Sequence, residues 1–446
     1  MPDIRSIPAA TVPPARRGSL VVQKYGGSSV ADAEGIMRVA RRVVATRRAG
    51  DEVVVVVSAM GDTTDELVEL AAQVSPDPGG REFDMLLSAG ERISMALLAM
   101  AITALGHEAR SFTGRQAGVI TEPVHNGARI VEMAPDRILA ALDAGSVPIV
   151  AGFQGVARET DTVTTLGRGG SDTTAVALAA ALGARVCEIY TDVDGVFTAD
   201  PRVAGKARKI DEISAVDMLE LASAGSRVLL ARCVEYARRH RVPLHVRSSF
   251  SGRDGTWVRD RQRSPEPSEP REPREGETEE MEDAIISGVA HDTSVARITV
   301  LDVPEGAGNA MRILRAVADA GIHLDLWARH TSTLSFTVPE AHGRAAVAAL
   351  RRMRDDIGFR DVRHDTAVGK VSLVGAGIAA DPRVTALFFE ALDTAGAEVF
   401  MASTAQVRIT ALTREDDIAK AVLALHTAFG LDSDSGEAVV YAGSGR

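Results

Sequence analysis

The stretch LVVQKYGGSSV, residues 20–30, begins the series of strand and helix signals that decides the fold of this chain. An apolar strand pattern runs into Lys24, and Gly26 and Gly27 follow almost at once. A strand followed by a tight turn explains the glycines, because glycine readily adopts the positive φ that such turns need. An anion site also explains them, because backbone N–H groups and an ammonium group can surround a phosphate. These residues alone leave both interpretations open.

Outward from this stretch, short β-branched runs alternate with longer helical stretches as far as about residue 250. Strands are predicted at 20–25, 51–60, 146–153, 185–191 and 242–249, and helices at 36–50, 92–106 and 173–184. The run VVVVV, residues 53–57, is apolar on both faces, as expected of a strand that is covered on both sides. The alternation predicts a three-layer α/β domain with a mainly parallel sheet, which we place at residues 19–252.

The remainder of the chain is predicted to hold a tail, a linker and two repeated units. Residues 1–18 contain prolines but no apolar core of a signal peptide, and we predict a disordered tail. Residues 253–283 include a proline- and glutamate-rich segment that buries too little apolar surface to offset its ordering entropy, which predicts a flexible linker. Beyond it the order strand, helix, strand, strand, helix occurs twice, which predicts two ferredoxin-like βαββαβ units at 284–367 and 368–446.

Charge and cysteine content exclude several classes of protein. The net charge of −11 argues against a general nucleic-acid binder, and the basic stretch at 237–247 is explained by a solvated helix end that leads into a strand. Cys187 and Cys233 are far apart and flanked by apolar residues, so they form neither a disulfide framework nor a zinc motif. This predicts a cytoplasmic protein. No apolar run approaches the ~20 residues of a membrane helix, so no membrane partner is expected.

A second stretch, TTLGRGGSDTTAVALAAALG at residues 164–183, has the properties of a ligand site. Glycines flank Arg168, and Ser171 and Asp172 then open an alanine-rich helix. A helix cap after a flexible turn explains the serine and the aspartate, but it does not explain the arginine. An arginine between glycines can approach a carboxylate or phosphate closely and bind it through two parallel hydrogen bonds. We therefore predict a ligand site here.

A third stretch, EIYTDVDGVFTADPR at residues 188–202, reads as a strand followed by an acidic turn. It is not a calcium loop, because its glycine comes too early and no glutamate occupies the twelfth position. The pattern alone therefore predicts no metal site here.

Together with SAMGDTTDEL and LLSAGERIS, these stretches resemble the aspartate kinase family in sequence and in order. The resemblance covers residues 19–251, and the two carboxyl-terminal units resemble the paired ACT domains of the same enzymes. It implies transfer of the γ-phosphoryl group of ATP to the β-carboxylate of L-aspartate, which gives 4-phospho-L-aspartate, the first step towards lysine, threonine and methionine or another aspartate-derived product. ATP and Mg²⁺ are the implied cofactors, with the metal bound through the ATP phosphates and no dedicated protein site.

The resemblance assigns roles to individual residues. Lys24 would neutralise charge on the transferred phosphoryl group, and Asp172 would either orient the phosphates through Mg²⁺ or position Lys24. The implied ATP-binding residues are Lys24, Gly26, Gly27, Ser28, Thr191, Asp192, Phe197, Arg202 and Arg227. The implied substrate-binding residues are Ser58, Thr64, Glu91, Arg168, Gly169, Gly170 and Ser171. No general base is required, because a carboxylate with a pKa near ~4 is already ionised at neutral pH.

The chain departs from the family pattern at several of these positions. Arg227 stands where relatives carry lysine, and Phe197 stands where many carry tyrosine. The first ACT unit departs further at its predicted effector site, which comprises Asp302, Glu305, Gly306, Arg329 and His330. These changes predict that inhibition by threonine or lysine is weakened or lost, although a site that still works through other contacts remains an alternative.

Two other functions are weighed against an active aspartate kinase. One is a regulatory protein that binds amino acids through its ACT units and carries an inactive kinase domain. The other is a different carboxylate kinase of the same superfamily. Because ACT units usually pair between chains, the expected assembly is a homodimer or a higher homo-oligomer.

Overall fold

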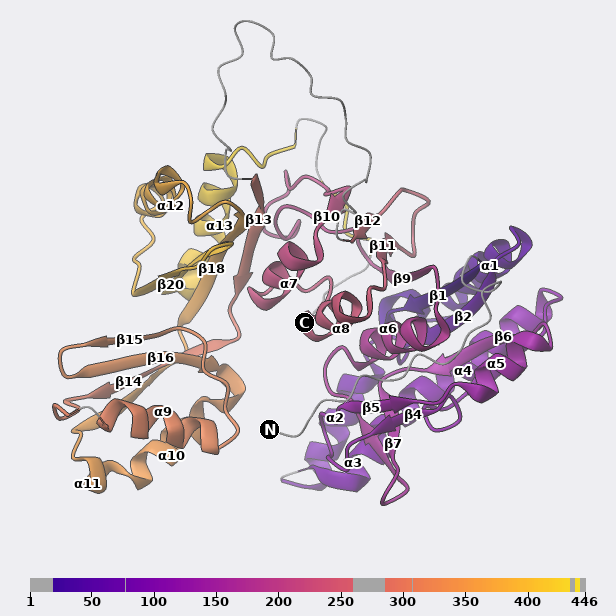
Figure 1. Ribbon diagram of the computed structural model, residues 1–446, viewed down its shortest axis with the longest axis horizontal. Coiled ribbons are helices and arrows are strands. Elements are labelled where there is room, and N and C mark those ends of the chain that lie inside the picture. The colour runs from indigo at the N-terminus through magenta and orange to yellow at the C-terminus, as the bar shows by residue number, and fades with distance from the viewer. Residues whose placement is uncertain (1–18, 77, 260–284, 307, 434–437, 442–446) are drawn as a thin grey trace, which may run out of the picture.

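The computed structural model describes residues 19–76, 78–259, 285–306, 308–433 and 438–441, and it contains the predicted α/β domain followed by two smaller α/β units (Figure 1). The predicted tail at 1–18 and residues 260–283 of the predicted linker lie outside the described residues.

The amino-terminal domain is built on an eight-stranded sheet. Its strands, in spatial order, are β10 (Glu212–Ile213), β12 (Thr256–Val258), β11 (Leu244–Ser248), β9 (Val186–Thr191), β1 (Leu20–Tyr25), β2 (Glu52–Val57), β6 (Val147–Ala151) and β3 (Ala109–Phe112). Every pairing is parallel except that of β11 with β12. The mainly parallel sheet predicted from the sequence is therefore confirmed.

Helices cover both faces of this sheet and form the outer layers. The helices of this domain are α1 (Ala33–Arg48), α2 (Thr63–Val74), α3 (Gly80–Leu87), α4 (Ala89–Ala104), α5 (Asp136–Asp143), α6 (Gly170–Leu182), α7 (Ala215–Ser223) and α8 (Ala231–His240). On β2, Val54 and Val56 pack into the core beneath α6 and α8, whereas Val55 and Val57 pack into the core beneath α1 and α4. The run of five valines is buried on both faces because each face contacts a separate helical layer.

A second, four-stranded sheet lies beside the first and was not predicted. It comprises β5 (Ile130–Met133), β4 (Val119–Thr121), β7 (Gln154–Ala157) and β8 (Thr162–Thr165). The stretch Gly80–Ala104, which spans α3 and α4, is apolar and long enough to cross a membrane by length and composition alone. Half of its most apolar window is buried within the fold, and a core helix meets the same criterion.

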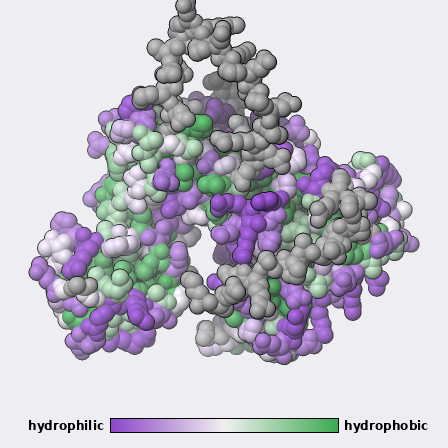
Figure 2. All heavy atoms as spheres, in the orientation of Figure 1, coloured by the Kyte–Doolittle hydropathy of each residue, from purple (hydrophilic) through white to green (hydrophobic). Residues whose placement is uncertain are grey.

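The basic stretch at 237–247 has the structure that was predicted for it. Helix α8 ends at His240, and β11 begins at Leu244. Arg238, Arg239 and Arg241 are exposed, and Figure 2 shows hydrophilic side chains gathered over α8.

The two carboxyl-terminal units each place helices on a four-stranded antiparallel sheet. The first unit contains β14 (Val295–Leu301), α9 (Asn309–Asp319), β15 (Trp327–His330), β16 (Thr333–Pro339), α10 (Gly343–Arg352), α11 (Arg354–Ile357) and β17 (Asp361–Asp365). The second contains β13 (Ile285–Asp292), β18 (Val368–Ala376), α12 (Pro382–Thr394), β19 (Met401–Thr404), β20 (Arg408–Arg414) and α13 (Ile418–Ala428). Their strand orders are β15-β16-β14-β17 and β13-β18-β20-β19.

Three boundaries differ from the sequence prediction. Strand β12 lies inside the predicted linker, where Thr256 is fully buried and accepts a hydrogen bond from the Val196 N–H at 2.8 Å. Strand β13 lies inside the predicted first unit at 284–367 but pairs antiparallel with β18, so it completes the sheet of the second unit (Figure 1). Residues 438–441 return to the amino-terminal domain, where the Tyr441 N–H donates to the Asp192 carbonyl at 2.9 Å. Each difference reflects backbone pairing between segments that are distant in sequence.

Candidate active site

Lys24 and Asp172 form an ion pair at the centre of the amino-terminal domain. Lys24 lies near the carboxyl end of β1, between β2 and β9, and Asp172 lies in the first turn of α6. The Lys24 Nζ is 2.6 Å from the Asp172 Oδ1, and the two side chains are 12% and 11% exposed. The structure thus brings together the two predicted catalytic residues. The contact is compatible with either role predicted for Asp172, which stay predictions.

Glycines let three loops approach one another around this pair. A Cβ on Gly27 would lie 2.8 Å from the Gly61 carbonyl oxygen and 3.0 Å from that of Ala59, so the loop after β1 contacts the loop after β2. Gly169, with φ of 68°, precedes α6, and a Cβ there would overlap the side chain of Leu230. The backbone conformation at position 169, in the predicted ligand-site stretch at 164–183, therefore requires glycine. Of the backbone N–H groups beside these glycines, that of Gly26 donates to the Tyr190 carbonyl at 3.2 Å and that of Gly170 donates to the Gly167 carbonyl at 2.9 Å.

Glu91 is a buried carboxylate next to the end of β2. It is 3% exposed, and its Oε1 accepts a hydrogen bond from the Ala59 N–H at 3.2 Å. Its Oε2 is buried and has no hydrogen-bond partner in the described part of the chain. Burial raises the pKa of Glu91 to about 7. A buried carboxylate oxygen without a partner is costly unless a ligand supplies a donor, which fits the predicted contact with a substrate amino group.

The remaining predicted substrate residues lie on the loops and helix ends around this pair. Ser58 is half-buried at the end of β2, and its carbonyl accepts a hydrogen bond from Ser94 Oγ at 2.6 Å, which ties β2 to α4. Thr64 is half-buried in the first turn of α2. Ser171 is 7% exposed, and it packs so closely against Gly152 at the end of β6 that a Cβ on Gly152 would lie 2.8 Å away. Arg168 is exposed on the loop before α6.

A cavity of about 300 Å³ opens at the carboxyl end of β9. It is lined by five predicted nucleotide-binding residues: Thr191, Asp192, Phe197, Arg202 and Arg227. The Arg202 Nη2 lies 2.8 Å from Asp192 Oδ2, so a cation and an anion that were predicted from the same motif meet at its rim. A larger cavity of about 740 Å³ lies between α8 and β12, but it contains none of the predicted residues. The smaller cavity is therefore the one whose lining carries the chemistry expected of a nucleotide site.

The cavity also has a wall that sequence reasoning missed. Val289, Ala290 and His291, all on β13, line it together with the predicted residues. Gly225 packs against this strand so closely that a Cβ would lie 2.1 Å from the His291 carbonyl oxygen. No local signal in β13 marks it as part of a nucleotide site, because the contact depends on its pairing within the second ACT unit.

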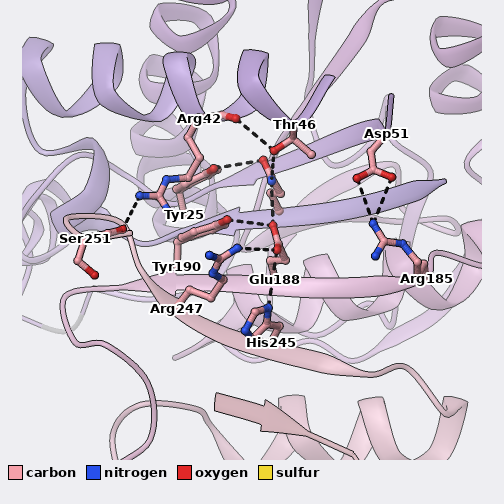
Figure 3. Close-up of polar contacts among 11 residues, drawn as sticks. Tyr25, Arg42, Thr46, Asp51, Arg185, Glu188, Tyr190, His245, Arg247 and Ser251 are labelled. Atoms are coloured by element: carbon pink, nitrogen blue, oxygen red, sulfur yellow. Dashed lines mark hydrogen bonds and ion pairs between the residues drawn. The ribbon is translucent and has the colours of Figure 1, made fainter. Parts of the chain in front are cut away.

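A polar network on the opposite face of β1 and β9 supports the ion pair and was also missed (Figure 3). Gln23 Nε2 donates to Glu188 Oε2 at 2.8 Å, and Tyr190 Oη donates to the same oxygen at 3.0 Å. The rings of Tyr25 and Tyr190 stack with centroids 4.6 Å apart. Because successive side chains of a strand point to opposite faces, this network holds β1 and β9 together behind Lys24.

The charge of Glu188 is stabilised within this network. Burial alone would raise the pKa of Glu188, but the nearby His245 ring, whose Nδ1 is 3.8 Å from Glu188 Oε1, hydrogen bonds from Gln23 and Tyr190, and the charge of Arg247 lower it to about 2. The carboxylate is therefore ionised throughout the physiological pH range.

The predicted effector residues lie on one side of the first ACT unit. The Val303 N–H donates to the Ser332 carbonyl at 2.7 Å, which places the loop containing Asp302, Glu305 and Gly306 beside the β15–β16 hairpin. Arg329 and His330 are exposed on β15. Asp302 forms a 3.1 Å ion pair with Arg360 and has a positive φ of 55°.

Comparisons with known proteins agree with this geometry. Residues 19–248 match the amino acid kinase family, and residues 371–429 match the ACT domain. Aspartokinases of Mycobacterium tuberculosis (strain ATCC 25618 / H37Rv) and Corynebacterium glutamicum are 54% and 53% identical over 435 residues, which is 96% of this chain and 100% of each relative. The chain belongs to the aspartokinase family.

Solved structures show the same architecture. Aspartokinase III of E. coli, in complex with aspartate and ADP, has a TM-score of 0.76 at 24% identity and covers 92% of this chain and 99% of its own. Aspartate kinase from Synechocystis is 38% identical with a TM-score of 0.50, over 93% of this chain and 70% of its own. The predicted family, the kinase domain and the ACT architecture are confirmed, and this member of the family is an ATP-dependent kinase. The alternative of a different carboxylate kinase is not supported.

Proposed function

We propose that this aspartokinase transfers the γ-phosphoryl group of ATP to the β-carboxylate of L-aspartate at the carboxyl ends of β1, β2 and β9. A β-carboxylate oxygen attacks the γ-phosphorus, the bond to the β–γ bridging oxygen breaks, and 4-phospho-L-aspartate and ADP are released. The observation that carries the proposal is the buried Lys24–Asp172 pair at 2.6 Å, flanked by the loops that contain Gly27 and Gly169.

The protein's part in this reaction is alignment and charge neutralisation. Two anionic reactants must be brought together, so catalysis depends on positioned cations and N–H donors rather than on a base. Lys24 supplies an ammonium group whose position is set by Asp172 on one side and by the β-sheet on the other. We propose that Glu91 accepts hydrogen bonds from the substrate amino group, that Arg168 binds a substrate carboxylate, and that Arg202 and Arg227 bind the nucleotide.

Magnesium is expected to enter with the nucleotide. Within the described ranges, no group of three or more His, Cys, Asp or Glu side chains could hold a metal ion. Mg²⁺ usually keeps several waters and binds substrate phosphates with one or two carboxylates, and the side chain of Asp172 fits that need. When bound, the ion would reduce the negative charge of the phosphates.

The test removes the charge of Lys24 and follows ADP release and acyl phosphate formation with aspartate. Lys24→Met should lower kcat by at least about 10²–10³-fold, the range seen when a donor to the transition state is removed. Because Lys24→Met leaves Asp172 buried without a partner, the double variant Lys24→Met/Asp172→Asn separates catalysis from folding.

Arg185→Met is the matched control. Arg185 forms a 3.0 Å ion pair with Asp51 at the opposite end of the same sheet, but its side chain is 48% exposed (Figure 3). We expect its kcat to stay within about twofold of wild type, since exposed ion pairs contribute little. Normal acyl phosphate formation by a folded Lys24→Met protein would disprove the mechanism.

We also propose that threonine and lysine inhibit this enzyme weakly. Asp302 forms an ion pair with Arg360, and Arg329 and His330 stand where relatives usually carry a neutral Gln–Asn pair. Polar groups that are mismatched to a ligand cost about 1–3 kcal/mol each. Inhibition should be slight at millimolar threonine or lysine in wild type and should strengthen in Arg329→Gln/His330→Asn. Strong inhibition of the wild type by either amino acid would end this proposal.

The wider role follows from the same reaction. We propose that the acyl phosphate feeds the synthesis of lysine, threonine and methionine in the cytoplasm, and that the ACT units pair two copies of the chain. Cys187 and Cys233 are both buried and unpaired, which suits a reducing compartment. Light scattering of the purified protein at several concentrations measures the assembly, and a monomer at all of them would contradict it.

A further inference from the structure

The chain from Thr191 to Lys206, part of which lines the nucleotide cavity, is attached to the second ACT unit at several points. The Val289 N–H of β13 donates to the Thr198 carbonyl at 2.7 Å. The Thr198 hydroxyl, which is 2% exposed, lies 2.8 Å from His426 Nε2 on α13. The Ser433 N–H, just beyond α13, donates to the Lys206 carbonyl at 2.8 Å. The cavity wall therefore belongs structurally to both domains.

The chain beyond α13 then reaches the start of this segment. The Ala438 N–H donates to the Gly205 carbonyl at 2.9 Å, and Val440 forms an antiparallel bridge with Val193. The Tyr441 N–H donates to the Asp192 carbonyl at 2.9 Å. Residues 438–441 thus lie along the loop that follows β9 and pair with it through an isolated bridge, and the residue they hold, Asp192, lines the nucleotide cavity.

The side chain of Tyr441 adds a contact to a buried carboxylate in the same loop. Its hydroxyl donates to Asp194 Oδ2 at 3.0 Å, and its ring stacks on Phe250 with centroids 6.1 Å apart. Asp194 is 2% exposed and also accepts from Ser251 Oγ at 2.5 Å and from Arg253 at 3.3 Å. Arg253 is 67% exposed, so Tyr441 and Ser251 are the better-ordered donors to Asp194.

We infer that Tyr441 is a positioning residue for the nucleotide-binding loop, and that through it the segment 438–441, which follows the second ACT unit, helps to set the affinity for ATP. The inference rests on the nucleotide site proposed above. Tyr441 does not touch that cavity. It holds Asp192 through the backbone and Asp194 through its hydroxyl, so the loop is ordered before nucleotide binds. A loop that must be ordered by the ligand binds that ligand more weakly.

The experiment compares Tyr441→Phe with wild type in steady-state assays and in calorimetric titrations with ADP. The substitution removes only the hydroxyl and keeps the ring stacking and the backbone hydrogen bond. We expect the KM for ATP and the Kd for ADP to rise together by about three- to tenfold, the range of one hydrogen bond. The KM for aspartate and kcat should stay within about twofold, because Lys24, Glu91 and their loops are unchanged.

Two further variants separate the possible outcomes. Tyr236→Phe removes the hydroxyl of a half-buried tyrosine on α8 that does not line the cavity, and it should change neither constant. Arg202→Ala tests the nucleotide site itself and should raise the KM for ATP. If Arg202→Ala raises it and Tyr441→Phe does not, the inference is overturned and the nucleotide site stands. If Arg202→Ala leaves the KM for ATP unchanged, the proposed nucleotide site is wrong, and the inference that rests on it is wrong as well. A fall in kcat together with a similar rise in the KM values for both ATP and aspartate in Tyr441→Phe, with a lower Tm, would show that Tyr441 has only a general structural role. That result would overturn the inference.

Discussion

The raised pKa of Glu91 predicts that aspartate binding strengthens as the pH increases through 7. The side chain is 3% exposed, and burial moves its pKa from 4.5 to about 7. A substrate ammonium group binds the carboxylate but not the carboxylic acid. At pH 6 only about a tenth of Glu91 is ionised, so the apparent KM for aspartate should be about tenfold higher at pH 6 than at pH 8.

The raised pKa of Glu91 also makes the free energy of unfolding depend on pH. The direction is opposite to that of most acidic residues, whose pKa is lowered by folding. Between pH 4.5 and about 7 the unfolded chain loses the Glu91 proton while the native protein retains it. The free energy of unfolding therefore falls across this window, by about 3 kcal/mol in total, and is constant above it. Glu91→Gln removes this fall, so its stability relative to wild type should increase by about 2.5 kcal/mol between pH 5 and pH 8.

The assay measures kcat/KM for aspartate at saturating ATP from pH 6 to pH 8. Glu91→Gln should show a raised KM for aspartate that no longer depends on pH. ATP phosphate also titrates near pH ~6, so the ratio of wild type to Glu91→Gln isolates the residue. Glu132→Gln, at a 40% exposed glutamate, is the control and should keep the wild-type profile. A pH-independent KM in wild type, or the same pH dependence in Glu91→Gln, would refute the reasoning.

Three further predictions concern the nucleotide cavity, the loop before α6 and the buried network. Arg227→Lys should change the KM for ATP, since the two cations differ in size and donor geometry; an unchanged value removes Arg227 from the site. Gly169→Ala should lower the Tm, because the new Cβ overlaps Leu230 at a φ of 68°, and adding Leu230→Ala should recover part of the loss if the overlap is the cause. Glu188→Gln should destabilise the protein by about 3 kcal/mol at pH 7, because the folded pKa of about 2 lies below the usual 4.5. That difference should shrink as the pH falls from 4.5 towards 2, and chemical denaturation at several pH values would contradict it by showing a constant difference.

Much of the candidate site could be predicted because its residues occur in local motifs. Lys24 on β1 and Asp172 at the start of α6 belong to separate local motifs, and because α6 packs against β1 the two side chains meet at 2.6 Å. The five predicted residues of the nucleotide cavity were recognised in the same way. His291 lines the cavity, and Tyr441 contacts the loop beside it. Neither could be predicted, because each is placed by pairing with a segment that is distant in sequence.

The sequence by itself determined the alternation of strands and helices, the glycine loops at the strand ends and the family to which the chain belongs. These depend on backbone preferences and side-chain patterns among neighbouring residues. Only the tertiary structure decided that β13 joins the second ACT sheet, because an apolar strand can pair with any compatible edge and the fold selects one. It also decided the pKa values of Glu91 and Glu188, about 7 and about 2, because burial and hydrogen-bond donors are supplied by segments far away in the chain.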